Sequence, residues 1–175
     1  AHLDRLERSL AELGISAPMS RAAMKIVLRE TLARNRIRNG IVYMQVTRGV
    51  ATRDHNYPAG LKPVLVVTAR HTNPARRASV LRDGISVVTV PDQRWARCDI
   101  KSISLLPNVL ARQTAKDKGV QEAWQVAADG LVTEGAATNA WIVDSAGILR
   151  TRPANGGILN GIVRQSIIGL LGELD

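Results

Sequence analysis

Residues 97–102 read Arg97-Cys98-Asp99-Ile100-Lys101-Ser102 and lead into an apolar run, Ile103, Leu105 and Leu106. The stretch places a lysine among apolar residues, whereas lysines prefer water. In such a setting the charged form of Lys101 is disfavoured, its pKa falls, and the neutral amine can attack a carbonyl to form a Schiff base. The alternative is a surface lysine whose stem packs on apolar neighbours while its charged end reaches water. The stretch alone favours this alternative, and the residues downstream decide between the two.

The composition limits the class of protein. The chain has 175 residues, enough for one large domain or two small ones, and 45% of them are hydrophobic. Phenylalanine is absent, so we expect an aliphatic core. The single cysteine, Cys98, excludes an internal disulfide framework and a cysteine-based structural zinc site, and we predict no metal site. No apolar run is long enough to span a bilayer, and we see no secretory signal; we expect a cytoplasmic protein that does not contact the membrane.

The net charge of +9 points to an anionic partner, because 19 of the 24 basic residues are arginine. Phosphate, carboxylate and nucleic acid are the candidates. The arginines are scattered and aromatic residues make up only 3% of the chain, so a stacking surface for single-stranded nucleic acid is not expected.

The hydrophobic pattern predicts alternating helices and strands. We expect helices over residues 1–13, 22–32, 78–82, 107–118 and 162–171, and strands over residues 41–47, 63–68, 85–90, 122–127, 131–133, 140–143 and 148–151. The valines of strand 85–90 predict burial on both of its faces. Arg5 lies beside the leucine stripe of the first helix, where the pattern alone predicts a solvated charge.

Three further features carry possible chemistry. Arg53 and His55 are two residues apart in a loop, so in an extended segment both would point the same way and could clamp a carboxylate. Glu134 stands at the end of a strand. Residues 153–161 form a glycine-rich loop that leads into a helix, where backbone N–H groups and the helix dipole favour an anion. Each feature has a simpler alternative. The loop with Arg53 and His55 could be a mobile polar loop, Glu134 an exposed carboxylate, and residues 153–161 a plain turn before a helix.

Together these features match what pyridoxal phosphate requires. Its aldehyde needs a lysine, its phosphate needs backbone donors and an arginine, and its pyridine nitrogen needs an acidic partner that keeps the ring an electron acceptor. Lys101, the glycine-rich loop and Glu134 supply these groups in one chain.

At this point the sequence resembles a known family, the class IV or fold-type IV pyridoxal-phosphate-dependent aminotransferases, and within it the D-amino acid aminotransferases. The matching stretches, which fall in the family's order, are His2-Leu3-Asp4-Arg5-Leu6, Tyr43-Met44-Gln45-Val46-Thr47-Arg48-Gly49, Arg53-Asp54-His55, Cys98-Asp99-Ile100-Lys101-Ser102, Val132-Thr133-Glu134-Gly135 with Asn139, and Leu159-Asn160-Gly161-Ile162-Val163-Arg164.

The resemblance implies a role for each site residue. Lys101 would form the Schiff base and carry the proton between the substrate Cα and the cofactor, and Glu134 would bond the pyridine nitrogen. Arg5 would contact the cofactor phosphate, contrary to its helix pattern. Leu159 would pack on the ring, while the backbone N–H groups of Ile162 and Val163 would complete the phosphate cradle.

The resemblance also implies a homodimer, because Arg53 and His55 would bind the substrate α-carboxylate in the partner subunit's site. Three positions depart from the family pattern. Val163 stands where threonine is usual, which keeps the backbone N–H but loses a hydroxyl. Ala136 and Ala137 stand where hydroxyl residues are common.

We therefore expect an α/β to α+β, two-domain fold-type IV enzyme. Residues 1–92 would complete a small N-terminal domain, residues 93–96 would connect, and residues 97–175 would begin a large domain. The chain starts at Ala1 without methionine and stops just after a predicted helix, so we expect a fragment truncated at both ends.

The function expected is ping-pong transamination between D-amino acids and 2-oxo acids. Alternatives with the same fold are aminodeoxychorismate lyase, branched-chain aminotransferase and amine transaminase; Leu106 stands where branched-chain enzymes commonly carry tyrosine. A basic nucleic-acid-binding domain and a cofactor-free remnant are the alternatives from other classes, although we expect no nucleic-acid partner.

Overall fold

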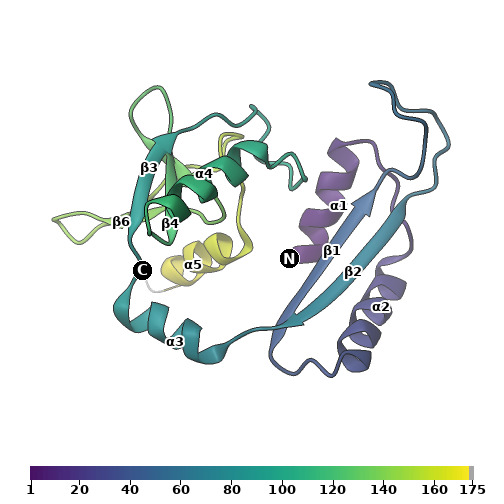
Figure 1. The fold of residues 1–175 in the computed structure, drawn as a ribbon, viewed down its shortest axis with the longest axis horizontal. Coiled ribbons are helices and arrows are strands. Elements are labelled where there is room, and N and C mark those ends of the chain that lie inside the picture. Colours follow the sequence, from purple (N-terminus) through teal and green to yellow (C-terminus); the bar gives the residue numbers. More distant parts are fainter. Residues whose placement is uncertain (174–175) are drawn as a thin grey trace. The chain divides into compact units, whose positions relative to one another are not determined.

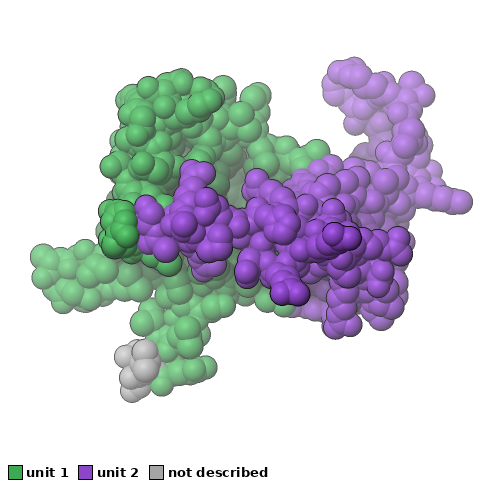
Figure 2. Space-filling view, turned by 60° about the horizontal axis from the view of Figure 1, so that its bottom comes forward, with its two compact units in different colours: residues 1–2, 80–175 green, residues 3–79 purple. Residues whose placement is uncertain are grey.

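The computed structural model describes residues 1–173, which combine helices with short sheets. They divide into two compact units, residues 3–79 and residues 1–2 together with the chain from residue 80 onward (Figure 1, Figure 2). The α/β to α+β class expected from the sequence is confirmed. The interdomain connection expected at residues 93–96 stays a prediction.

The unit of residues 3–79 is a helical pair with a β-hairpin. Its elements are α1 (His2–Glu12), α2 (Arg21–Arg34), β1 (Gly40–Thr47) and β2 (Val64–His71). The strands pair antiparallel with Thr47 opposite Val64, which makes residues 48–63 the hairpin loop. Side chains alternate along the hairpin, so Val42 and Met44 are partly buried while Ile41 is exposed. Helix α2 packs on β2.

Local signals in the sequence set the helix ends of this unit. The Ser20 hydroxyl accepts the Ala23 N–H at 3.2 Å and so caps α2. Arg21, the first residue of α2, pairs with Asp4 and Glu7 of α1, which links the two helices. Gly14 follows α1 with a φ of +58°, a conformation that suits a residue without a side chain.

The second unit contains a mixed three-stranded sheet with the order β3-β4-β5. Its elements are α3 (Pro74–Asp83), which crosses the boundary between the units, β3 (Val87–Pro91), α4 (Leu106–Asp117), β4 (Glu122–Val126), β5 (Val132–Gly135), β6 (Trp141–Val143), β7 (Leu149–Thr151) and α5 (Ile162–Gly172). Strands β3 and β4 are parallel and α4 is their crossover, whereas β4 and β5 are antiparallel.

Alanines form the core between α4 and the sheet. Ala111 and Ala115 of α4 are buried together with Ala123 of β4 and with Ala136, and Val88 packs against them. Small side chains let the helix backbone approach the strands closely. The core is therefore aliphatic, as the absence of phenylalanine predicted.

Strand β3 corrects one expectation from the sequence. Val87 is 36% exposed and Thr89 is exposed, whereas Val88 and Val90 are partly buried. The expectation of burial on both faces was wrong, because β3 is an edge strand of the sheet and α4 packs against one face of it. Helix α3 also begins earlier than expected, since the Asn73 side chain accepts the Ala75 N–H at 3.0 Å ahead of its first turn.

Candidate active site

The candidate site is built at the carboxyl end of β3, from residues that follow this strand and from residues of β5. Asp92 follows β3 directly and donates its N–H to the Val126 carbonyl at 2.8 Å. Thr133 and Glu134 are buried on β5. The irregular segment between β3 and α4 then carries Arg94 and Lys101. Residues at a strand's carboxyl end are free to face a ligand, which makes this edge of the sheet suitable for a site.

Lys101 is exposed on this irregular segment, although the preceding Ile100 is buried. The apolar run that follows is exposed too, with Leu106 at 69%. Residues 1–173 therefore place the lysine at the surface, as the stretch alone favoured, and do not form an apolar environment around it. Its role as the Schiff-base residue stays a prediction. Nearby, burial raises the pKa of the Cys98 thiol, which donates to the Trp95 carbonyl at 3.0 Å.

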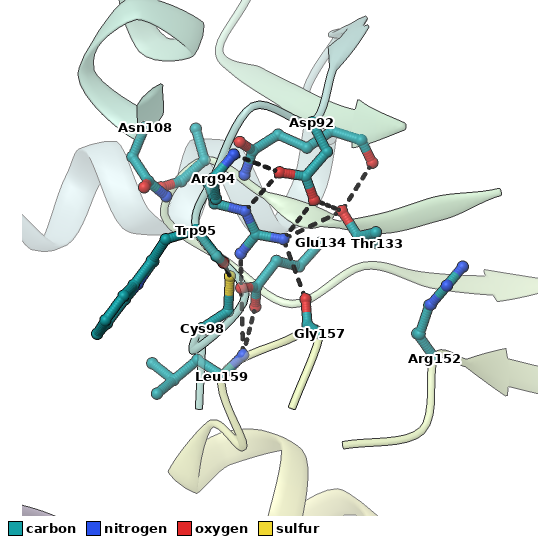
Figure 3. A network of polar contacts seen from close by, with 12 residues as sticks. Asp92, Arg94, Trp95, Cys98, Asn108, Thr133, Glu134, Arg152, Gly157 and Leu159 are labelled. Atoms are coloured by element: carbon teal, nitrogen blue, oxygen red, sulfur yellow. Dashed lines mark hydrogen bonds and ion pairs between the residues drawn. The ribbon is translucent and has the colours of Figure 1, made fainter. Parts of the chain in front are cut away.

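Glu134 is held by three donors and is almost fully buried, with its side chain 8% exposed. Figure 3 shows two of these donors, Arg94 and the Leu159 N–H. Arg94 donates to one carboxylate oxygen, and the Asn139 amide donates to the other at 2.9 Å. The Leu159 N–H is shared between both oxygens at 3.2 and 3.3 Å. Burial raises the pKa of Glu134, while Arg94 and the Leu159 N–H act in the opposite direction.

Arg94 connects Glu134 to a second buried carboxylate, Asp92 (Figure 3). Its Nε and one terminal nitrogen donate to the two Asp92 oxygens at 2.9 and 2.6 Å, and the Thr133 hydroxyl bonds Asp92 at 2.7 Å. Burial alone would raise the pKa of Asp92, but these hydrogen bonds lower it from 3.8 to about 2. Burial likewise disfavours the Arg94 cation, yet Asp92 and Glu134 raise its pKa above the ordinary value.

Sequence reasoning selected neither Asp92 nor Arg94. The available signal was an acidic residue directly after an apolar strand, with an arginine two positions later. That signal is weak because it does not indicate that Asp92 and Arg94 form hydrogen bonds with residues of β5, about forty positions further along the chain.

Leu159 and Asn139 join Glu134 to the start of α5. The Asn139 amide also donates to the Leu159 carbonyl at 2.8 Å. A Cβ at Gly161 would lie 2.2 Å from the Asn139 Oδ1, so a larger residue here would displace the Asn139 side chain. The structure thus brings Glu134 and Leu159 together, and Leu159 lies three positions before Ile162, where α5 begins.

The N-terminus of α5 offers backbone donors. Its N-cap is Gly161, which has no side chain to cap the helix, so the first N–H groups, those of Ile162 and Val163, have no intrahelical partner. The Val163 side chain is 72% exposed. Arg164, buried in the same turn, donates to the Arg152 carbonyl at 3.0 Å and fixes the preceding loop. Such a helix end suits an anion.

Arg5, Arg53 and His55 belong to the other unit. Arg5 on α1 is partly buried, and burial lowers its pKa, yet within residues 1–173 it has no carboxylate partner at salt-bridge distance. Arg53 and His55 are exposed in the hairpin loop. The loop is anchored at its base by Arg48, which donates to the Gly14 carbonyl at 2.8 Å and stacks on Tyr57 at 3.6 Å.

Within residues 1–173, no group of three or more His, Cys, Asp or Glu side chains is arranged to hold a metal ion. In the same part of the chain, no helix is long and apolar enough to cross a bilayer.

Comparison with known proteins identifies the family. The profile of the amino-transferase class IV family matches residues 1–174. The chain is 42% identical to a D-alanine aminotransferase of Bacillus licheniformis, in an alignment that covers 98% of this chain. It is 41% identical to a D-alanine aminotransferase of Staphylococcus haemolyticus, in an alignment that covers 95% of this chain. It spans 59% and 58% of those relatives.

Solved structures agree on the fold. A branched-chain amino acid aminotransferase of Escherichia coli matches 99% of this chain and 58% of its own, with a TM-score of 0.85 and 24% identity. One from Thermoproteus uzoniensis, solved with norvaline, matches 99% of this chain and 58% of its own, with a TM-score of 0.77 and 25% identity. The fold-type IV resemblance is confirmed: the chain belongs to the amino-transferase class IV family.

Proposed function

We propose that the protein carrying this chain transfers amino groups between D-amino acids, such as D-alanine, and 2-oxo acids, such as 2-oxoglutarate, with pyridoxal phosphate as cofactor. The curated relatives named above support the substrate class. The observation that carries the proposal is the buried Glu134 carboxylate, which is connected through Leu159 to the N-terminus of α5.

The residues present fit this cofactor. A carboxylate accepts about four hydrogen bonds. Glu134 receives three donors, of which the Leu159 N–H is shared between both oxygens, so a protonated ring nitrogen bound to one oxygen would leave the Leu159 N–H to the other. The N–H groups of Ile162 and Val163 suit a phosphate. Arg5, a partly buried guanidinium that has no carboxylate partner among residues 1–173, would suit the same dianion.

Each residue would contribute one element of the chemistry. When bound, pyridoxal phosphate supplies an aldehyde that condenses with amines and a ring that accepts electrons. The Lys101 amine would hold the aldehyde at rest. Once an amino substrate has taken its place there, the freed amine would carry a proton between the substrate Cα and the cofactor. The Glu134 carboxylate would hold the proton on the ring nitrogen. Leu159 would pack on the ring and exclude water from it.

Arg53 and His55 would bind the substrate α-carboxylate. Both are exposed on the hairpin loop, where a guanidinium can offer its planar fork to a carboxylate. We propose that the loop serves the site of a partner subunit, so that the active form is a homodimer. The cytoplasmic location expected from the sequence is part of the same proposal, and cell fractionation would test it.

The test is turnover of D-alanine with 2-oxoglutarate by the purified protein, with pyruvate as the readout. Lys101→Ala should reduce turnover by about a thousandfold or more, since the lysine is both nucleophile and proton carrier. Lys116→Ala on α4, an exposed lysine of the same unit, is the matched control and should keep full turnover.

The choice between D- and L-amino acids as substrates distinguishes the proposed activity from the alternative activities with the same fold. A visible absorption band that shifts with D-alanine and not with L-alanine supports the proposal. Turnover of branched-chain L-amino acids alone would assign a branched-chain aminotransferase instead. Pyruvate release from aminodeoxychorismate would assign the lyase. Full turnover by Lys101→Ala would contradict the role given to this residue.

A further inference from the structure

The buried charges around Glu134 do not cancel. Asp92, Arg94 and Glu134 have side chains that are 12%, 5% and 8% exposed, and together they contain two carboxylates and one guanidinium, a net charge of −1. A buried charge that is left over is expensive unless a partner of opposite sign completes it. The inference below rests on the proposed function, which supplies such a partner, the protonated ring nitrogen.

The geometry shows how the guanidinium divides between the two carboxylates. Arg94 gives Asp92 two parallel bonds, from Nε at 2.9 Å and from a terminal nitrogen at 2.6 Å. It gives Glu134 a bond from its other terminal nitrogen only. The Arg94 backbone N–H also donates to Asp92 at 3.0 Å, and the Thr133 hydroxyl bonds the other Asp92 oxygen at 2.7 Å. Asp92 is therefore the principal counterion of Arg94.

This division matters for Glu134. With Asp92 uncharged, Glu134 would be the only carboxylate partner of Arg94 among residues 1–173, and the pair would be neutral. A neutral pair would attract a protonated ring nitrogen much less than an anion does, because charge-assisted hydrogen bonds are about twice as strong as neutral ones. With Asp92 ionised, the Glu134 charge is left for the ring.

We propose that Asp92 is a positioning residue that neutralises Arg94 and so reserves the negative charge of Glu134 for the ring nitrogen of the cofactor. Arg94 would then orient Glu134 without cancelling its charge. Neither the sequence motifs nor the names of the relatives assign a role to Asp92.

The test compares two ligands that differ at one atom. The apoprotein, in its full chain, is titrated with pyridoxal phosphate and with its 1-deaza analogue, in which a C–H group replaces the ring nitrogen. The ratio of the two dissociation constants measures the bond between the ring nitrogen and Glu134. General damage to the site weakens both ligands alike, because they share the phosphate and the aldehyde, and so leaves the ratio unchanged.

Asp92→Asn should lower the preference for pyridoxal phosphate over the analogue by about tenfold, the difference expected between a charged and a neutral acceptor. Asp117→Asn removes the same charge from an exposed position on α4 and should leave the preference unchanged. If the asparagine amide prevents folding, Asp92→Ser removes the charge while leaving room for a water that accepts from Arg94, and the same loss is expected.

The outcomes separate the inference from the function on which it rests. If folded Asp92→Asn or Asp92→Ser keeps the same preference for pyridoxal phosphate over the analogue, the role of Asp92 is overturned. The proposed function is not affected by that result if the unaltered protein still turns over D-alanine. An unaltered protein that binds neither ligand would overturn both. If Asp117→Asn lowers the preference for pyridoxal phosphate as much as Asp92→Asn does, the effect comes from the overall charge of the protein. That result would also overturn the inference.

Discussion

Replacing Arg94 by methionine should make the stability of the second unit strongly dependent on pH. The change leaves Asp92 and Glu134 buried side by side without a guanidinium. Removing one partner of a buried ion pair typically costs 3–5 kcal/mol, which is about the loss we expect at pH 7. Arg94 has a side-chain exposure of only 5%, so water can replace few of its bonds.

The sign of the pH dependence follows from the carboxylates. In the unaltered protein the pKa of Asp92 is depressed to about 2, so its stabilisation is complete above the unfolded value near 3.8 and is lost as the pH falls through 2. That shift corresponds to about 2 kcal/mol. In Arg94→Met we expect both carboxylates to have raised pKa values, because burial is then no longer offset by the guanidinium. The variant should therefore gain stability as the pH falls from 7 toward 4. The gap between the two proteins should therefore narrow on acidification.

Urea unfolding followed by tryptophan fluorescence measures this gap, because Trp95, Trp124 and Trp141 all lie in the second unit. We expect the difference in unfolding free energy to shrink by about 2 kcal/mol or more between pH 7 and pH 3. Arg150→Met is the control, since Arg150 pairs with Asp144 but is 58% exposed, and it should show no such trend. A gap equal at both pH values would refute the electrostatic reasoning.

Two further substitutions test the geometry. Gly161→Ala would place a Cβ 2.2 Å from the Asn139 Oδ1 and should lower stability by about 1–3 kcal/mol in thermal unfolding, whereas Gly157→Ala, which meets open space, should be nearly neutral. Arg48→Ala removes the stack on Tyr57 and the anchor of the hairpin loop, so limited proteolysis within residues 50–60 should become faster; an unchanged cleavage rate would contradict this anchoring role.

Local patterns predicted most of the elements. Alternation over residues 41–47 predicted β1, and Pro107 correctly marked the first turn of α4. The errors arose where neighbours far along the chain decide the outcome. The burial of β3 depends on its place at the edge of the sheet, and a run of valines does not encode that place.

The site shows the same division. The family motifs selected Glu134 and Leu159, and the structure brings these residues together. Asp92 and Arg94 were missed because their importance lies in bonds to residues 39 to 63 positions away. Spacing within a segment cannot reveal a contact that depends on how β3 and β5 flank β4.

The three departures from the family pattern have different physical settings. Ala136 is buried in one cluster with Ala111 and Ala115, so a hydroxyl there would have to be accommodated in the alanine core beside α4. Ala137 is exposed, which leaves space at that position for a polar side chain. Val163 is exposed, but its N–H remains at the open end of α5. A phosphate bound there would be held by backbone donors. Val163→Thr would add a hydroxyl at this position and should tighten cofactor binding. Ala136→Ser would place a hydroxyl in the buried core and should lower the stability of the protein.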